Sequence, residues 1–246
     1  MARGARDADP LEHLFSGVTI SANGGRSLVL LGPNGCGKTS VARAILGLAS
    51  LSSGRRTARP GIRFAYMPQD YRNAVFPWLS LKKNVALRLR QGAGDTTNEE
   101  DLIGHTAHEM VAMFRRLDLT VDLDRYPDEV SGGQLQLVLF VATLVMPGDV
   151  RVFDEPFSAL DFRRRAIASE IISERIPMKP DEAWILITHD IAEGVQLADD
   201  VAVLGPTRSI SAQINVPLSW PRGSEVRDAP ASLAALRAVG EAAGIA

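Results

Sequence analysis

The chain has 246 residues, of which 46% are apolar and 23% are charged, a composition that excludes collagen-like, disordered and coiled-coil proteins. Its 27 basic and 29 acidic residues leave a net charge of −2, which argues against a dedicated nucleic-acid-binding protein. The one cysteine, Cys36, excludes an intrachain disulfide and a zinc site made of cysteines. The N-terminus lacks an apolar signal-peptide core, and the longest apolar stretch, Leu135–Met146, covers about half a membrane span, so we expect a cytosolic chain.

The first predicted elements are a strand, a glycine-rich turn and a helix. The short apolar run Leu28–Leu31 predicts a buried strand, and the glycines that follow predict a turn. From Lys38 onward, Val41, Ile45 and Leu48 recur with helical spacing on one face. A strand, a glycine loop and a helix in this order are typical of the beginning of an α/β sheet.

The middle of the chain is predicted to be helical and the last third to return to the α/β pattern. A loop rich in Ser, Arg and Gly covers residues 50–60, and the polar break Gln91–Glu100 separates two predicted helices of an inserted region. The further predicted elements are a strand at Ile62–Met67, helices at Leu81–Leu89 and Leu102–Leu117, a helix after residue 134 through Val145, a strand at Val150–Phe153, a helix at Arg163–Arg175, a strand at Ala183–Thr188, a helix at Ile191–Ala198 and a strand at Asp200–Leu204.

The strongest motif is a phosphate-binding loop that fits G-x-x-x-x-G-K-[ST]. Its glycines let backbone N–H groups converge on phosphate oxygens at the start of a helix. Lys38 adds a mobile charge for the β- and γ-phosphates, and Thr39 can place its hydroxyl on Mg²⁺. A chance match in a glycine-rich turn is the alternative. The predicted nucleotide-binding residues here are Gly32, Pro33, Asn34, Gly35, Cys36, Gly37, Lys38, Thr39 and Ser40.

A second motif is the apolar run Val150–Phe153, which Arg151 interrupts and which ends in Asp154 and Glu155. Asp154 is predicted to be the anionic anchor that Mg²⁺ needs beside a phosphate loop. Glu155 is predicted to be a general base that polarises an attacking water. A turn or cap residue at position 154 and a solvated charge at position 155 are the alternatives.

Taken in order, these motifs resemble the ATP-binding subunit of ABC transporters over nearly the whole chain. Ser131-Gly132-Gly133-Gln134 is similar to the core of the family's signature sequence, with Val130 where Leu is usual. The other matching segments are Gln69 for the Q-loop glutamine, Pro156–Asp161 for the D-loop and Thr188-His189-Asp190 for the switch histidine. The resemblance implies one ABC domain over 1–246: a P-loop NTPase core with a mostly parallel sheet, a reduced N-terminal antiparallel β lobe and an inserted helical subdomain over 70–130.

The resemblance also implies the cofactors, ATP and Mg²⁺, and the role of each site residue. Two such domains sandwich two ATP molecules head to tail, so that each phosphate loop faces the partner's Ser131, Gly132 and Gly133, with Gln134 beside them. Glu155, His189 and Lys38 carry the hydrolysis. Thr39, Gln69 and Asp154 bind the metal, and Asp161 links the two sites.

The expected partners follow from the same resemblance. They are a second ATP-binding domain in a homo- or heterodimer, transmembrane permease subunits and a solute-binding protein, with no nucleic acid. The chain would sit peripherally on the cytoplasmic side of the inner membrane. Phe76-Pro77-Trp78-Leu79-Ser80 and Asn84-Val85-Ala86-Leu87 are similar to importers of nitrate, sulfonate, taurine and bicarbonate, which implies a small anion as the solute. For Pro77 and Trp78, the alternative is an ordinary aromatic staple of the helical lobe. For the whole chain, the alternative is a non-transport ABC ATPase or a regulatory ATP-binding module with little turnover.

Two departures from the family pattern lead to further expectations. Residues 1–14 contain no Phe, Tyr or Trp to stack on adenine, and Phe15 is expected to pack into the core, with stacking as the alternative. The run after Gln134 is Leu-rich where the family tends to have arginines, which predicts lost polar contacts near the signature segment.

Overall fold

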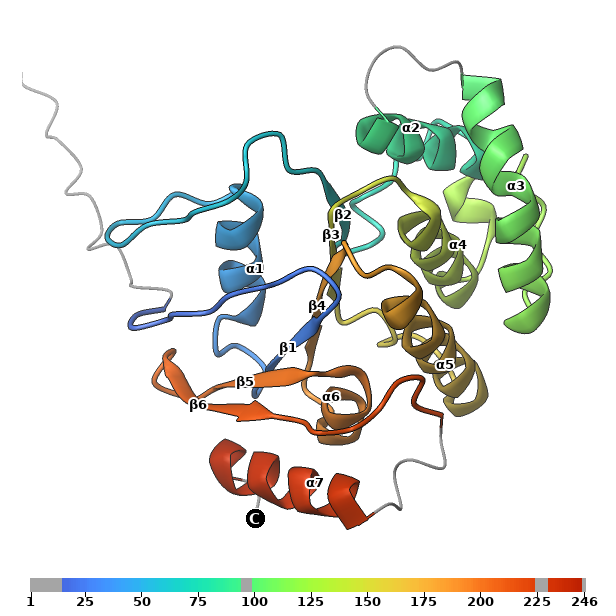
Figure 1. The fold of residues 1–246 in the computed structure, drawn as a ribbon. Coiled ribbons are helices and arrows are strands. Elements are labelled where there is room, and N and C mark those ends of the chain that lie inside the picture. The colour runs from blue at the N-terminus through green and yellow to red at the C-terminus, as the bar shows by residue number, and fades with distance from the viewer. Residues whose placement is uncertain (1–14, 94–98, 224–229, 245–246) are drawn as a thin grey trace, which may run out of the picture.

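A six-stranded sheet forms the centre of the protein in this computed structural model, which describes residues 15–93, 99–223 and 230–244 (Figure 1). The strand order is β2-β3-β4-β1-β5-β6. The first five strands of this order pair in parallel, and β6 pairs antiparallel to β5. The strands are β1 (Ser27–Leu31), β2 (Phe64–Met67), β3 (Val150–Asp154), β4 (Ala183–Thr188), β5 (Asp200–Leu204) and β6 (Ile210–Asn215). The predicted α/β class with a mostly parallel sheet is confirmed.

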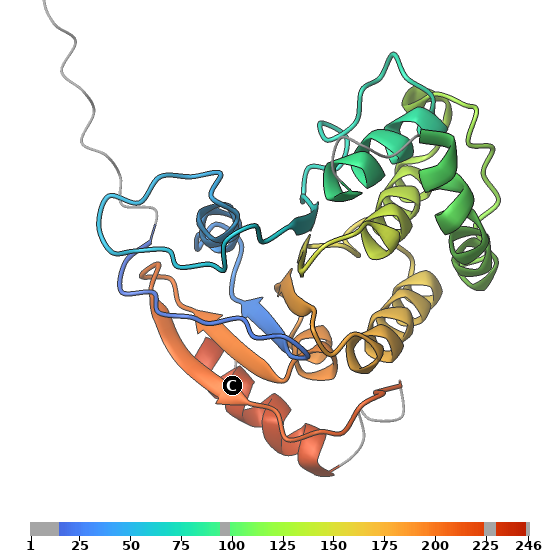
Figure 2. The ribbon, with the colours of Figure 1, turned by 45° about the horizontal axis from the view of Figure 1, so that its top comes forward.

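Helices cover both faces of the sheet because alternate strand residues point to opposite sides (Figure 2). Leu28 and Leu30 join an apolar cluster with α1, whereas Val29 and Leu31 join the larger cluster that contains α4 and α5. The helices are α1 (Lys38–Leu46), α2 (Leu81–Ala93), α3 (Glu99–Arg116), the short 3₁₀ helix η1 (Pro127–Glu129), α4 (Gly132–Val145), α5 (Phe162–Met178), α6 (Ile191–Leu197) and α7 (Pro230–Ala243). Near-continuous apolar strands are typical of a sheet that is buried on both faces.

The helical region contributes α2 and α3, which pack on α4 far from α7 (Figure 1). Every residue of α4 from Leu135 to Val145 is buried, because the sheet and the neighbouring helices enclose it. Two ion pairs join α3 to α5: Arg116 with Glu174 at 2.6 Å, and Arg175 with Glu109. Among the described residues, no helix is long and apolar enough to cross a membrane.

The expected N-terminal antiparallel lobe differs from what the structure shows. Residues 15–26 and 48–63 form no strands, and β5 with β6 is the antiparallel pair of the described ranges. The second segment holds Pro60, which lacks a backbone donor, and Gly54 and Gly61 at positive φ, all of which disfavour a regular ladder. The strand predicted from Ile62 accordingly begins at Phe64, whereas β6 and α7 had no prediction.

Arg151, which interrupts the predicted third strand, is buried and has polar partners inside the protein. Its guanidinium forms an ion pair with Glu182 at 2.6 Å and lies over the ring of Trp184. Its Nη1 also donates to the carbonyl of Thr143 in α4 at 2.6 Å. A buried charge is tolerated only when it is paired and hydrogen-bonded, and Arg151 meets both conditions.

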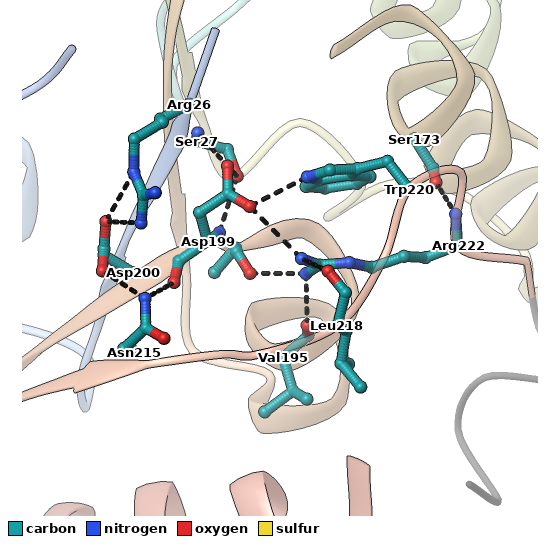
Figure 3. Close-up of polar contacts among 11 residues, drawn as sticks. Arg26, Ser27, Ser173, Val195, Asp199, Asp200, Asn215, Leu218, Trp220 and Arg222 are labelled. Atoms are coloured by element: carbon teal, nitrogen blue, oxygen red, sulfur yellow. Dashed lines mark hydrogen bonds and ion pairs between the residues drawn. The ribbon is translucent and has the colours of Figure 1, made fainter. Parts of the chain in front are cut away.

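A polar network at the start of β1 and β5 holds the segment that leaves β6 (Figure 3). The carboxylate of Asp199 accepts from the Ser27 N–H at 2.9 Å and from the Trp220 indole at 2.8 Å, and it pairs with Arg222 at 3.3 Å. Arg222 is fully buried, stacks on Trp220 and donates to the Leu218 carbonyl at 2.7 Å. Burial lowers the pKa of Arg222 to about 10, so it remains charged at neutral pH. The network lies at the end of β1 opposite the phosphate loop.

Candidate functional site

The phosphate loop, Gly32–Thr39, leaves the carboxyl end of β1 and enters α1. A side chain at Gly32 would lie 2.4 Å from the Leu204 carbonyl oxygen, so no larger residue fits there. Gly35 and Gly37 have φ of 80° and 102°, which L side chains rarely adopt. These conformations let the loop turn directly into α1, whose first N–H groups have no acceptor within the helix and are available to an anion.

Lys38 is held over this loop. Its side chain is only 5% exposed, and its Nζ donates to the carbonyls of Gly32 at 2.7 Å and Pro33 at 2.9 Å. Within the described residues, no carboxylate lies within ion-pair distance of this ammonium group. The direct contacts of this positive charge are therefore carbonyl dipoles, and an anion on the loop could exchange with them.

Asp154, at the end of the central strand β3, provides a buried negative charge beside the loop. It is 1% exposed, and neither carboxylate oxygen has a hydrogen-bond partner in the described part of the chain. Burial raises the pKa of Asp154 to about 6, and the Glu155 charge adds to the shift, while the Thr39 hydroxyl and the Lys38 charge oppose it. An unpartnered buried carboxylate is unfavourable unless something neutralises it.

Oxygen atoms from three segments meet near Asp154 and fit a hard divalent cation. The Thr39 hydroxyl donates to Gln69 Oε1 at 3.4 Å, which joins the start of α1 to the segment after β2. Hydroxyl, amide and carboxylate oxygens are the ligands that Mg²⁺ prefers, usually with waters in the remaining positions. The side chains of Thr39, Gln69 and Asp154 therefore suit this metal. The predicted metal-binding residues lie together, as the prediction requires.

Glu155 and His189 face each other across the ends of two neighbouring strands. Glu155 follows β3 and His189 follows β4, and the distance from His189 Nδ1 to Glu155 Oε1 is 3.6 Å. The Glu155 backbone has φ of 48°, and its N–H donates to the Ile187 carbonyl at 3.0 Å. A left-handed backbone at a non-glycine residue is unfavourable and persists where the surroundings impose it. The turn directs the carboxylate of Glu155 toward the histidine.

The segment that carries His189 is braced by residues that the sequence did not single out. The Thr188 hydroxyl donates to the buried Glu193 at 2.7 Å and accepts from the Asp190 N–H at 3.0 Å. Arg165 of α5 lies 3.6 Å from Asp190 and 3.5 Å from Glu193. Burial raises the pKa of Glu193. In the sequence, Arg165 stands out only as one of three consecutive arginines at 163–165. Such a run is equally typical of a solvated helix face.

The signature segment, Ser131–Gln134, is structured at the start of α4 and does not reach the phosphate loop. The Ser131 hydroxyl accepts from the Gln134 N–H at 3.2 Å, and Gln134 Oε1 accepts from the Ser131 N–H at 2.9 Å, which is a capping box. Gln134 also donates to the Thr120 carbonyl at 3.1 Å. The ends of the Tyr71 and Arg72 side chains lie close to Gly132: a Cβ there would be 3.0 Å from the Tyr71 hydroxyl and 2.7 Å from the Arg72 guanidinium.

Asp161 is likewise separate from the phosphate loop. Its carboxylate caps α5 by accepting from the Arg164 N–H at 2.9 Å. The structure thus brings the phosphate-loop and metal-binding residues together, namely Lys38, Thr39, Gln69 and Asp154. It also pairs Glu155 with His189. The signature segment and Asp161 lie elsewhere and do not contribute to this site within the described chain.

The aromatic residues of the predicted subfamily motif are exposed on a turn before α2. Phe76 is 46% and Trp78 is 70% exposed, and their ring centroids are 5.4 Å apart. Asn84 is buried and ties the turn: it accepts from the Phe76 N–H at 2.8 Å and donates to the Leu79 carbonyl at 3.0 Å. Phe15 packs against the apolar cluster on the α1 face of the sheet, as predicted, whereas residues 1–14 lie outside the described residues.

Comparisons with known proteins agree with this geometry. The sequence model described as "ABC transporter" matches residues 15–158. The aliphatic sulfonates import ATP-binding protein SsuB of Bacillus subtilis is 30% identical over 222 residues, which are 87% of this chain and 82% of that protein. The sulfate/thiosulfate import ATP-binding protein CysA of Pseudomonas putida is 30% identical over 89% of this chain and 65% of its own length. A solved dimer of the ATP-binding cassette MJ0796, bound to ADP and Pi, superposes with a TM-score of 0.70 at 18% sequence identity. The match covers 86% of this chain and 96% of that one, so the two share the same fold.

The buried carboxylate predicts a pH-dependent stability. Because the pKa of Asp154 is raised from 3.8 to about 6, the folded chain retains a proton that the unfolded chain has released, and stability falls as the pH rises through this window. We expect Asp154→Asn, which cannot ionise, to raise the free energy of unfolding by about 1–3 kcal/mol at pH ~8, and the gain to vanish near pH ~4. Urea unfolding of metal-free, nucleotide-free protein measures this. Asp181→Asn, at an exposed site, is the control, and an Asp154→Asn chain no more stable than wild type at high pH would contradict the assignment.

Proposed function

Because the chain belongs to the ABC transporter family, we propose that it is the ATP-binding and ATP-hydrolysing subunit of an importer for a small solute. The observation that carries the proposal is the pair of buried charges, Lys38 and Asp154, neither of which has an ion-pair partner in the described residues. A bound nucleotide with its metal ion supplies the two missing counter-charges. The proposal takes 1–246 as one ABC domain with 70–130 as its inserted helical subdomain.

The phosphate loop binds the nucleotide through backbone and side chain together. The N–H groups of residues 34–39, which include the N-terminus of α1, are the donors for the phosphates, with Asn34 and Gly35 exposed at the mouth of the loop. Lys38 exchanges its two carbonyl contacts for oxygens of the β- and γ-phosphates. Thr39, Gln69 and Asp154 hold Mg²⁺, which when bound neutralises charge on the phosphate oxygens.

Hydrolysis requires a base close to the γ-phosphate, and Glu155 has this role. Its carboxylate accepts a proton from the water that attacks the γ-phosphorus, as the bond from that phosphorus to the ADP oxygen breaks. His189, 3.6 Å from Glu155, orients the water and contacts the γ-phosphate. The turn at Glu155 and the bracing of the Thr188–Glu193 segment hold both groups in place before the substrate arrives.

A second ATP-binding domain completes the site. Ser131, Gly132, Gly133 and Gln134 are not used by the phosphate loop of their own chain, and the N-terminal end of α4 offers donors for the γ-phosphate bound to a partner copy. Asp161 lies at a separate helix start and serves as the link between the two sites. The structurally similar cassette MJ0796 is described as dimeric, which supports this arrangement.

The importer is completed by transmembrane permease subunits and a solute-binding protein, with the chain on the cytoplasmic side of the membrane. The subfamily motif and the sulfonate-import relatives favour a small anion such as a sulfonate, nitrate or taurine. Relatives that import spermidine/putrescine, lactose or sulfate/thiosulfate match nearly as well, so the solute rests on the motif at Phe76–Ser80. Exposed rings on that turn suit docking to a permease.

Replacing the lysine of the phosphate loop should weaken nucleotide binding. Lys38→Ala removes the one side-chain cation that the loop itself carries, and a hydrogen bond to a charged group contributes roughly 1.5–3 kcal/mol, so the dissociation constant for ATP should rise about 10- to 100-fold. Isothermal titration with MgATP measures it. Lys83→Ala, exposed on α2, is the matched control, and wild-type affinity in Lys38→Ala would refute the loop assignment.

Replacing the proposed base should separate binding from turnover. Glu155→Gln keeps the shape of the side chain but cannot accept the proton, so ATP hydrolysis should fall at least ~100-fold while ATP binding persists. ATP should then hold the variant as a closed dimer, which size-exclusion chromatography with light scattering detects. Glu241→Gln, exposed on α7, should change neither property. If Glu155→Gln turns over ATP at the wild-type rate, Glu155 is not the base.

The exposed rings before α2 should be needed for assembly with the permease. Trp78→Ala should weaken complex formation by about 30-fold or more, as expected for an aromatic residue at the centre of an interface, and should leave ATP binding by the isolated chain unchanged. Met178→Ala, which removes an equally exposed apolar side chain at the end of α5, is the control. Co-purification with the permease and transport by the complex measure the effect. If the Trp78→Ala variant assembles with the permease as wild type does, Trp78 is not part of the docking surface.

A further inference from the structure

One buried amide connects the signature helix to the turn that carries the proposed base. Gln136 lies in α4 just after the signature segment and is 1% exposed. Its Oε1 accepts from the Ala159 N–H at 3.0 Å, and its Nε2 donates to the Ser158 hydroxyl at 3.2 Å and to the Glu155 carbonyl at 3.5 Å. All three contacts therefore fall within one short stretch, Glu155–Ala159, which we name the catalytic turn.

Besides Gln136, the catalytic turn is held at its start and its middle: the Glu155 N–H donates to the Ile187 carbonyl at 3.0 Å, and Phe157 is buried with its ring against Phe140. The internal hydrogen bond of the turn runs from the Ser158 N–H to the Glu155 carbonyl at 3.3 Å, and Glu155 at its start has φ of 48°. Gly133, one turn of α4 before Gln136, lies close enough to the Ala159 carbonyl that a Cβ would be 3.4 Å from it. Since an irregular backbone is held in an unfavourable conformation only by its surroundings, the amide of Gln136 is an important part of what holds this turn.

We propose that Gln136 is a positioning residue for hydrolysis, which fixes the catalytic turn, and with it Glu155, to the signature helix. The inference rests on the proposed function and extends it to a residue that does not touch ATP. Because Gln136 and the signature residues belong to one continuous helix, a displacement of the first residues of α4 by the nucleotide on a partner copy moves Gln136 as well. The amide then passes this displacement to the turn and sets the Glu155 carboxylate for its own site.

A purely structural role makes a different prediction. If Gln136 only satisfied buried polar groups, its loss would lower stability and reduce ATP binding and turnover together. A positioning role instead lowers kcat while the ATP affinity of the phosphate loop is preserved, because the side-chain hydrogen bonds of Gln136 in the described chain go to Glu155–Ala159 and not to the phosphate loop. The split between kcat and binding decides between the two roles.

The test uses the full chain with three variants. Gln136→Met keeps the length of the side chain and removes its donors and acceptor, so kcat for ATP should fall at least about tenfold with the dissociation constant within about twofold of wild type. Ser158→Ala removes one contact and should lower kcat about two- to fivefold. In the double variant the loss should be no larger than in Gln136→Met alone, because both changes remove the same link.

Thr143→Val is the matched control. Thr143 is a fully buried polar residue of the same helix, its hydroxyl donates to Leu139, and it has no contact with the catalytic turn. It should lower the urea midpoint as Gln136→Met does but leave kcat within about twofold of wild type.

Each outcome decides the proposal. Wild-type kcat in Gln136→Met, or parallel losses of kcat and ATP affinity in both Gln136→Met and Thr143→Val, overturns it. If Gln136→Met does not fold, Ser158→Ala decides alone, and an unchanged kcat there overturns the proposal. A wild-type chain that binds ATP but does not hydrolyse it would instead overturn the proposed function, since no turnover would then exist for Gln136 to support.

Discussion

The constraint on which the structure depends is the burial of two opposite charges, on Lys38 and Asp154, that have no ion-pair partner in the described chain. Removing these charges from water is unfavourable, and no ion pair within the site compensates for the lost hydration. The sheet offsets this cost with apolar residues on both faces, which fill one cluster against α1 and another against α4 and α5. What remains at the carboxyl edge of the strands is a site already arranged for phosphates and a divalent cation.

The carbonyl groups at the C-terminal end of the signature helix α4 receive their hydrogen bonds from other elements. α4 is largely apolar, and no basic side chain of its own lies in its last turn, where the final carbonyls lack partners within the helix. Arginines from two other elements reach this end: Arg151 of β3 donates to the Thr143 carbonyl, and Arg175 of α5 donates to the Leu144 carbonyl at 3.0 Å. Positive charge at a helix C-terminus is also favoured by the helix dipole. At the near end, Gln136 is the residue of the Leu-rich run whose side chain makes polar contacts with the turn after β3.

Local patterns predicted the elements well wherever a motif or a strong apolar period was present. The strand before the phosphate loop, the helix after it and the strand ending at Asp154 lie where the patterns placed them. β6 was missed although its sequence carries a signal: Ile210, Ala212 and Ile214 alternate with polar residues, which is the pattern of a half-buried strand. α7 was missed as well, although Pro230 at its first position and its many Ala and Leu residues favour a helix. It packs on β5, β6 and α6.

The sequence by itself determined the chemistry of the phosphate loop, the anionic residue at the end of β3 and the family, because each depends on residue types at fixed, short spacings. Only the tertiary structure decided which side chains share a site. Arg165 lies beside Asp190 and Glu193, and Gln136 contacts the turn at Ser158, across 22 positions of sequence. Neither residue differs in sequence from an ordinary polar residue on a helix. Their roles come from burial and from neighbours that are distant along the chain, and these exist only once the helices have packed against the sheet.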